Sequence, residues 1–291
     1  MEFHCHMLSF IYDEAFSRNI GWVTRQEQDR LRYKRVAIAG LGGVGGVHLL
    51  TLCRLGIGKF HLADFDSFDL ANFNRQAGAS VSTLSIPKLE VMIRQARDIN
   101  PELEIKGFSE GVTAANLDEF LEGVDIYIDG LDFFAFSARQ QVFDACASKG
   151  IPAVTAAPLG MGVAVLNFLP GGMGFNDYFC LNDGPEAQKP LRFLMGVAPA
   201  RLQMGYLADP SAVDLANQKG PSTIMACQLC AGVAATEALK ILLGRGAVRA
   251  APKGYHFDAY RNKLMLTWRP GGNRHPLQRL AIALGKRKLG L

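Results

Sequence analysis

Four polar side chains have the types and spacing to handle a triphosphate. The stretch DFDSFDLANFNRQ (64–76) carries Asn72 and Arg75, Lys88 starts the next expected helix, and Asp132 follows a buried strand-like run. Breaking a triphosphate at its α-phosphorus builds charge on the departing pyrophosphate, which nearby cations stabilise. Arg75 and Lys88 could supply those cations, and Asn72 could position an oxygen. Asp132 is a candidate Mg²⁺ ligand, either directly or through water.

A glycine-rich turn lies upstream of this cluster. Gly40, Gly42 and Gly45 form G-x-G-x-x-G between an apolar strand and an apolar helix. Such glycines let the backbone approach a phosphate, and the helix start supplies N–H donors. Asp64 ends the next strand, where a carboxylate can bind ribose hydroxyls. The alternative for the glycines is a turn that is needed only for tight packing. The alternative for residues 64–76 is a solvated surface loop with salt bridges.

The elements around these residues alternate between strand and helix. Strand patterns are followed by helices until about residue 169, and two more strand-like runs come near the C-terminus. This order predicts an α/β fold with a doubly wound, Rossmann-like, mostly parallel sheet and C-terminal antiparallel strands. We expect one compact domain with four parts: an N-terminal helical arm (1–34), a nucleotide-binding part (35–169), a long crossover loop with one helical patch (170–221) and a helix, strand pair and basic tail (222–291).

Composition narrows the class of protein. The chain has 291 residues, 49% hydrophobic and 20% charged, which allows a large core, and its net charge of +4 does not indicate a nucleic-acid binder. Six scattered cysteines without a secretion signal favour a reducing cytoplasm. Prolines and glycines interrupt the apolar stretch at 151–169, so we expect no membrane span there.

Taken together, the motifs GLGGVG, DFD…ANFNRQ, PK and D…LD resemble the ThiF/MoeB adenylating enzymes, relatives of the ubiquitin-activating enzymes. The resemblance covers roughly residues 16 to 245. It implies that ATP and Mg²⁺ are used to adenylate a carboxylate, often the C-terminus of a ubiquitin-like or sulfur-carrier protein or peptide. It also implies a homodimer. The nucleotide-binding residues would be Gly40, Gly42, Gly43, Gly45, Asp64, Asp66, Asn72, Arg75, Lys88 and Asp132.

The resemblance adds one residue from outside the cluster. The segment FSRNIG (16–21) is similar to the family's N-terminal arginine motif. Arg18 would then be delivered to the triphosphate of the partner subunit. Without the resemblance, an arginine near a terminus is best explained as a surface charge.

Several positions depart from the family pattern. Ala71 replaces a serine, and Phe133 replaces an asparagine beside the expected metal ligand. The paired CxxC motifs of zinc-binding relatives are absent, so we expect no zinc site. Cys180 stays open between a sulfur-handling nucleophile and an incidental thiol. The cysteines of CQLC (227–230) are expected to be small buried residues in a helix, and the HCH segment at 4–6 is too short to define a metal site.

Three other functions remain as alternatives to adenylation of a protein C-terminus. A related tRNA-modifying branch activates a threonylcarbamoyl carboxylate, and tRNA would be a partner only there. An inactive nucleotide-binding scaffold subunit is another alternative, and an NAD-dependent oxidoreductase is the last. The presence of Arg18, Arg75, Lys88 and Asp132 together argues against the last two, because neither needs cations around a triphosphate.

Overall fold

One eight-stranded sheet forms the centre of the protein. The computed structural model describes residues 10–214 and 217–289. The strand order is β3-β2-β1-β4-β5-β6-β7-β8, with the first five strands parallel and β6, β7 and β8 antiparallel to their neighbours. This confirms the predicted sheet. The strands are β1 (Arg35–Ala39), β2 (Lys59–Ala63), β3 (Glu104–Phe108), β4 (Ile126–Asp129), β5 (Ala153–Leu159), β6 (Gly162–Phe168), β7 (Lys253–Asp258) and β8 (Lys263–Trp268).

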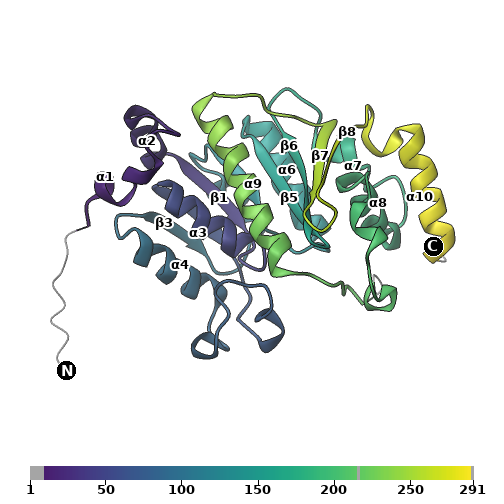
Figure 1. Cartoon of the computed structure of the whole chain (residues 1–291), viewed down its shortest axis with the longest axis horizontal. Helices are drawn as coiled ribbons and strands as arrows, with labels where there is room; N and C mark the ends of the chain where they lie inside the picture. The colour runs from purple at the N-terminus through teal and green to yellow at the C-terminus, as the bar shows by residue number, and fades with distance from the viewer. Residues whose placement is uncertain (1–9, 215–216, 290–291) are drawn as a thin grey trace.

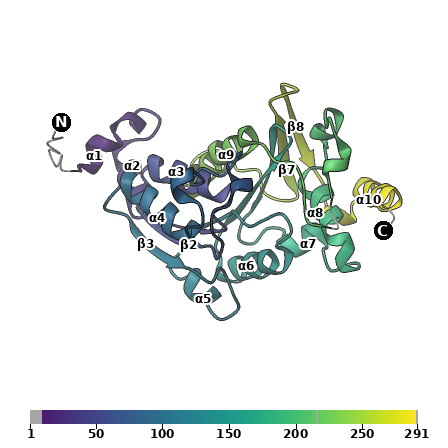
Figure 2. The same ribbon diagram turned by 90° about the horizontal axis from the view of Figure 1, so that it is seen from below.

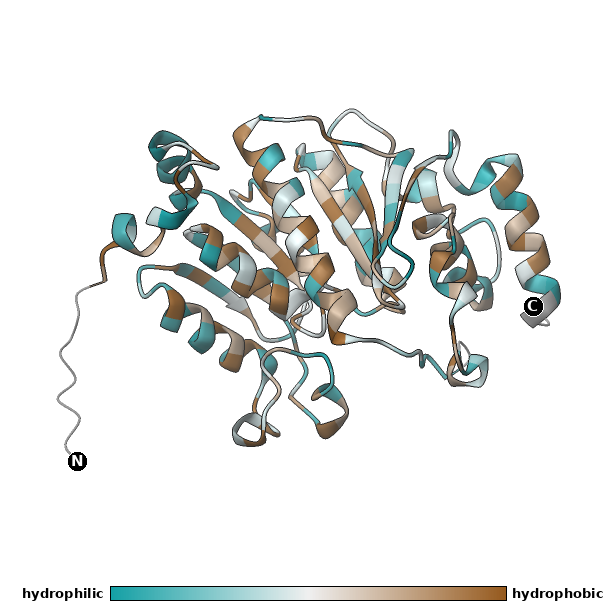
Figure 3. Ribbon diagram, viewed as in Figure 1, coloured by the Kyte–Doolittle hydropathy of each residue, from teal (hydrophilic) through white to brown (hydrophobic). Residues whose placement is uncertain are grey.

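Helices cover both faces of the parallel part of the sheet (Figures 1 and 2). On one face lie α3 (Gly45–Leu55), α4 (Lys88–Ile99) and α9 (Ile224–Leu243), and on the other lie α5 (Leu117–Phe120) and α6 (Phe136–Lys149). Because Val36 and Ile38 of β1 enter one core and Ala37 and Ala39 enter the other, this run must be apolar. Figure 3 shows hydrophobic, brown residues along the central strands and on the helices that cover them. The remaining α-helices are α1 (Tyr12–Ala15), α2 (Arg25–Arg32), α7 (Phe175–Phe179), α8 (Lys189–Val197) and α10 (Pro276–Leu289).

Short local signals fix where the main helices begin and end. Thr24 and Glu27 form a capping box at the start of α2, and the hydroxyl of Thr223 accepts the Ala226 N–H at the start of α9. Gly56 ends α3 with a φ of 92° and Gly244 ends α9 with a φ of 64°, a conformation that glycine adopts without strain. These residues therefore set where α2 and α9 begin and where α3 and α9 end.

The segment 170–221 is more ordered than a long loop. The predicted helical patch is α8, but a second helix, α7, was missed. Its Phe175 and Tyr178 are buried, and the Phe175 ring stacks on Phe143 of α6 with centroids 4.4 Å apart. Aromatic residues are poor helix formers, so tertiary burial and not local preference stabilises α7.

The helix α9 is long and apolar enough by length and composition to cross a membrane. However, 56% of its most apolar window is buried inside the protein, where it packs on β5, β6 and α3. A core helix of a globular domain passes the same test. The stretch at 151–169, for which the sequence predicts no membrane span, forms β5 and β6.

Candidate nucleotide site

The predicted site residues gather at the carboxyl ends of three neighbouring strands. In the sheet, β1 lies between β2 and β4. The chain runs from β1 outward to β2 and β3, and then returns to β4 on the other side of β1. The carboxyl ends of β1 and β4 therefore form a topological switch point, the place where open α/β sheets bind ligands. The glycine turn, Asp64 and Asp132 follow β1, β2 and β4 in turn.

The glycines of the turn have two different roles. A Cβ atom on Gly40 would come within 2.3 Å of the Gly130 carbonyl oxygen, and one on Gly45 would collide with the Gly40 carbonyl oxygen. These two glycines let α3 cross tightly over the strand ends. In contrast, a Cβ on Gly42 would meet nothing nearer than Gln76 at 3.6 Å, and Gly43 is likewise partly exposed. The packing explanation thus holds for Gly40 and Gly45. Gly42 leaves open backbone before α3, whereas a Cβ on Gly43 would lie 3.2 Å from the Cys227 sulfur, so Gly43 is partly exposed but packs closely against Cys227 and Arg75.

Asp64 links the glycine turn to the loop after β2. One carboxylate oxygen accepts the Leu41 N–H at 2.6 Å and the other accepts the Asp66 N–H at 2.8 Å. Burial raises the pKa of Asp64, while these N–H donors and the Lys88 ammonium oppose the rise. A carboxylate has about four acceptor positions, so this one keeps capacity for ribose hydroxyls.

Lys88 and Arg75 bring two cations to this edge. The Lys88 ammonium is 3.0 Å from a carboxylate oxygen of Asp66, and its side chain is 8% exposed while that of Asp66 is 54% exposed. Arg75 donates from Nη1 to the Ala71 carbonyl and the Asn74 side-chain oxygen, both at 2.9 Å. Among the described residues no carboxylate pairs with Arg75. Its charge is therefore available to an anionic ligand beside Gly43.

Asn72 shapes the loop that carries Arg75. Its side-chain oxygen accepts the Asp69 N–H at 3.0 Å, and its carbonyl accepts the N–H groups of Arg75 and Gln76. Gln76 is 7% exposed, and its Oε1 atom has no hydrogen-bond partner among the described residues. The amide group of this side chain lies beside Gly42. Because a buried acceptor without a donor is costly, its Oε1 atom fits a ligand or water that donates to it.

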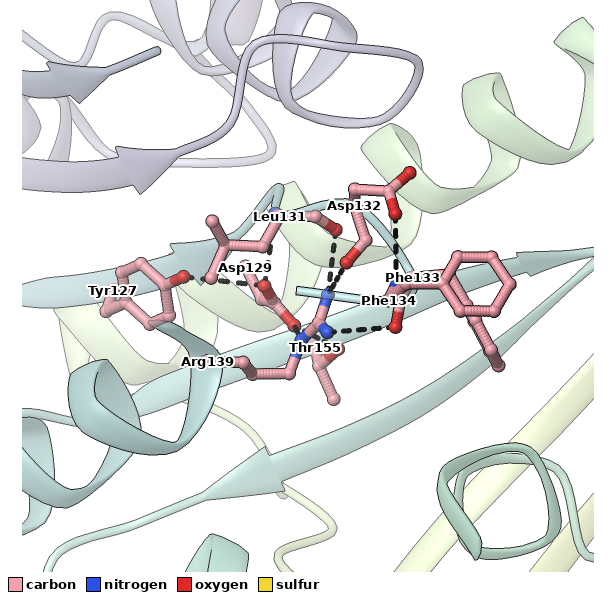
Figure 4. A network of polar contacts seen from close by, with 8 residues as sticks. All are labelled: Tyr127, Asp129, Leu131, Asp132, Phe133, Phe134, Arg139 and Thr155. Atoms are coloured by element: carbon pink, nitrogen blue, oxygen red, sulfur yellow. Dashed lines mark hydrogen bonds and ion pairs between the residues drawn. The ribbon is translucent and has the colours of Figure 1, made fainter. Parts of the chain in front are cut away.

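Asp132 projects from a loop that is held from below (Figure 4). One of its carboxylate oxygens accepts the Phe134 N–H at 2.9 Å, and the side chain is exposed. Arg139 of α6 donates from Nη2 to the carbonyls of Leu131 and Asp132, at 2.7 and 2.9 Å. Asp129 in turn holds Arg139 through a buried ion pair of 2.8 Å. The exposed carboxylate on a fixed loop suits a Mg²⁺ ion, which prefers oxygen ligands and retains waters.

Arg18 lies apart from this cluster. It is an exposed residue of the short 3₁₀ turn Ser17–Asn19 between α1 and α2. The neighbouring Asn19 donates to the Leu55 carbonyl at the end of α3, just before β2 begins. Arg18 therefore lies at the amino edge of the parallel strands, opposite to the site. A five-residue strand spans roughly 16 Å, so this arginine does not reach the site of its own chain.

Cys180 is also separate from the cluster. Its thiol is 3% exposed and donates to the Asp177 carbonyl at the end of α7, and burial raises its pKa. Reactive cysteines are usually accessible thiolates of lowered pKa, so this environment does not activate it. Of the two explanations left open by the sequence, this environment favours an incidental thiol.

The other cysteines and histidines singled out in the sequence were considered as metal ligands. Cys227 and Cys230 are buried in α9, as expected for small core residues. Within residues 10–214 and 217–289 no group of three or more His, Cys, Asp or Glu side chains is placed to hold a metal ion. The HCH segment at 4–6 lies outside the described residues, and the absence of zinc stays a prediction.

Three residues of the site were not predicted. Gly130 permits the close approach of Gly40, Arg139 clamps the Asp132 loop, and Gln76 faces Gly42. A glycine directly after a buried strand was a usable signal for Gly130. Arg139 carried a weaker signal, a charge on an otherwise buried position of an expected helix. Nothing in the local pattern distinguished Gln76 from the polar residues before it.

The fold is a doubly wound α/β sheet that gathers a glycine turn, two cationic side chains and two carboxylates at its switch point. The ThiF family model matches residues 16–279, so the chain belongs to the ThiF family. The match extends past residue 245, where the resemblance seen in the sequence ended.

Named relatives share parts of this chain. It is 32% identical over 142 residues to the tRNA threonylcarbamoyladenosine dehydratase of Bacillus subtilis, covering 48% of this chain and 55% of that protein. It is 29% identical over 189 residues to the sulfur carrier protein ThiS adenylyltransferase of Escherichia coli, covering 65% and 74%. Similarity to the SAMP-activating enzyme E1 of Haloferax volcanii is 28% over 235 residues, covering 80% and 77%. The chain thus spans only about half the length of the first of these relatives.

Solved structures support the fold. E. coli MccB with MccA-N7isoASN matches with a TM-score of 0.66 at 18% identity, covering 89% of this chain and 72% of that chain. E. coli tRNA N6-threonylcarbamoyladenosine dehydratase matches with a TM-score of 0.58 at 22% identity, covering 80% and 95%. At these identities the likeness concerns the fold alone.

Proposed function

We propose that the protein is an ATP-dependent adenylyltransferase that activates a carboxylate and releases pyrophosphate. The carboxylate belongs to the C-terminus of a ubiquitin-like or sulfur-carrier protein or peptide. The observation that carries the proposal is Arg75, which pairs with no carboxylate of the described residues and lies beside the partly exposed Gly43, together with Lys88 at the same switch point. The adenylyltransferases and activating enzymes among its relatives support the same class of reaction.

Each group at the site has a part in this reaction. A carboxylate oxygen of the substrate attacks the α-phosphorus of ATP, and the bond from that phosphorus to the bridging oxygen of pyrophosphate breaks. Asp64 accepts bonds from the ribose, and the open backbone at Gly42, with the partly exposed Gly43 beside it, lies against the phosphates. Arg75 and Lys88 stabilise the charge that moves onto the leaving pyrophosphate.

A magnesium ion fits the same arrangement. Asp132 is the exposed carboxylate on the β4 side, and Arg139 fixes its loop without neutralising the side chain. Bound there, Mg²⁺ would neutralise phosphate charge. Arg18 is the third cation of the proposed site, after Arg75 and Lys88. Because it lies at the far edge of its own sheet, it acts on the site of a partner subunit.

The choice of nucleotide is tested by thermal unfolding with each ligand. ATP with Mg²⁺ should stabilise the protein by about 2.7 kcal/mol at a hundredfold excess over the Kd. NAD should give no stabilisation, because it lacks the charge that Arg75 and Lys88 match. Stabilisation by NAD without stabilisation by ATP would show that the site serves an oxidoreductase.

The tRNA branch is the second candidate, favoured by the 32% identity to the B. subtilis dehydratase. Both candidates need ATP, so only the carboxylate distinguishes them. ATP–pyrophosphate exchange should be compared with sulfur-carrier proteins and with threonylcarbamoylated tRNA as the added substrate. Exchange that only the tRNA stimulates would decide for the second candidate.

A further inference from the structure

The last helix, α10, presents its leucines to solvent. Leu277, Leu280 and Leu284 are 57%, 59% and 57% exposed. Their spacing of three and four residues places them along one flank of the helix. A helix on the surface of a globular protein normally turns its apolar stripe toward the core. These three leucines, which we call the α10 face, are turned away from it.

Other residues of α10 hold the helix against the protein. Gln278 is 2% exposed and donates to the Met195 carbonyl of α8 at 2.6 Å. Ile282 is 5% exposed, and a Cβ on Gly285 would lie 2.7 Å from a methyl carbon of Leu191, so α10 packs closely on α8. The helix is therefore a fixed part of the fold, and its leucines are exposed although another side of it is packed.

The charges of the chain are divided between this end and the rest. No Asp or Glu follows Asp258, whereas eight Lys and Arg residues do. Because the whole chain has a formal net charge of +4, residues 259–291 carry +8 and residues 1–258 carry −4. On α10, Arg279 and Arg287 are exposed, each within one turn of a leucine of the α10 face. A negatively charged surface attracts the basic end of such a molecule and orients it.

We propose that α10 binds the surface of a membrane that contains anionic lipids. With 14 residues the helix is too short to cross a bilayer, so it lies in the plane of the interface. The leucines of the α10 face enter the boundary between headgroups and acyl chains, and Arg279 and Arg287 contact the headgroup phosphates. A nucleic acid would match the arginines but not the leucines, and an uncharged protein surface would match the leucines but not the arginines.

The α10 face lies away from the proposed nucleotide site. In the sheet, β5 to β8 follow one another on the side of β4 that is remote from β1. Figures 1 and 2 show α10 beyond that end of the sheet, opposite to α1. A protein held through α10 therefore keeps its switch point open to ATP and to a carboxylate substrate. Membrane binding goes beyond the proposed function and does not rest on it.

Cosedimentation with lipid vesicles tests the proposal. The wild type should pellet with phosphatidylcholine vesicles that contain about one-third phosphatidylglycerol, but not with vesicles of phosphatidylcholine alone. Its binding should weaken as the salt concentration rises, because salt screens the headgroup charge. No binding to the anionic vesicles, or equal binding to both kinds of vesicle, would overturn the proposal.

Matched leucine variants test the contact itself. Leu280→Gln/Leu284→Gln should weaken binding to the anionic vesicles by about tenfold or more. Both side chains are exposed, so the variant should fold. The control, Leu264→Gln/Leu266→Gln on β8, removes two leucines that are 58% and 57% exposed and should bind as the wild type does. Equal binding by the two double variants would overturn the α10 face as the contact.

Arginine variants test the charge. Arg279→Gln/Arg287→Gln should also weaken binding to the anionic vesicles, because two contacts with headgroup phosphates are lost. The control, Arg94→Gln/Arg97→Gln, removes two exposed arginines of α4 and the same net charge, and its binding should not change. Equal binding by these two variants would overturn the contact of the α10 arginines with lipid.

Other outcomes identify a different occupant or separate the inference from the proposed function. If the wild type ignores vesicles but Leu280→Gln/Leu284→Gln has a lower mass by sedimentation, the α10 face joins two copies and the proposal is overturned. If it ignores vesicles but binds tRNA through Arg279 and Arg287, the basic end recognises nucleic acid in place of lipid. If it binds anionic vesicles as described but shows no pyrophosphate exchange, the proposed function fails and the membrane contact stands.

Discussion

Replacing Arg139 with methionine should strongly destabilise the protein. Its guanidinium pairs with Asp129 at 2.8 Å, and the two side chains are 3% and 2% exposed. It also donates to the carbonyls of Leu131, Asp132 and Phe133. Methionine leaves the buried carboxylate without its cation, although the Thr155 hydroxyl still donates to it. Removing one partner of such a pair costs about 3–5 kcal/mol, and we expect a loss of that size here.

Urea unfolding of Arg139→Met and Arg139→Lys measures this loss. Lysine keeps the charge but lacks the planar fork, so its loss of stability should be smaller. The double variant Asp129→Asn/Arg139→Met should lose less than the sum of the single changes, since the two residues act together. Because the clamp fixes the Asp132 loop, Arg139→Met should also raise the Mg²⁺ concentration for half-maximal exchange by about tenfold or more. A loss below about 1 kcal/mol with unchanged Mg²⁺ dependence would refute the clamp.

Three further predictions concern other residues. Burial lowers the pKa of His48 to about 4, so between about pH 6.5 and 4 the unfolded chain binds one more proton than the folded chain at this residue. As the pH is lowered through this range, the free energy of unfolding should therefore decrease by up to about 1.4 kcal/mol per pH unit. His48→Leu should flatten this slope when unfolding is measured as a function of pH. Cys180→Ala should leave adenylate formation and any later transfer intact, whereas selective loss of transfer would restore a nucleophilic role. Mixed Arg18→Ala and Asp132→Ala subunits should regain up to about half the wild-type exchange per heterodimer, and no recovery despite verified subunit exchange would exclude action across the interface.

The sheet was predictable because its signals are local. Continuous apolar runs such as β1 and β4 reveal strands buried on both faces, and the glycine turn fixes the first crossover. The helix α7 was not predictable in this way, because its stability comes from aromatic contacts with α6 across a long separation in the chain.

The residues of the site likewise fall into those that local sequence signals predict and those that only the folded structure reveals. Asp64, Lys88 and Asp132 follow strand ends or start a helix, so topology alone brings them to one edge. The partners that hold them are less visible in sequence. Arg139 lies in a later helix, and its link to Asp129 exists only after α6 packs on β4. The distance of Arg18 from its own site likewise emerges only from the folded arrangement.

Exchange of labelled pyrophosphate into ATP tests the central claim most directly. With Mg²⁺ and a carrier protein that has a free C-terminal carboxylate, the wild type should incorporate label, and it should not do so when that C-terminus is amidated. Lys88→Met and Asp132→Asn should lose exchange while remaining folded. Release of ADP and phosphate in place of AMP and pyrophosphate, or wild-type exchange by Asp132→Asn, would contradict adenylation at this site.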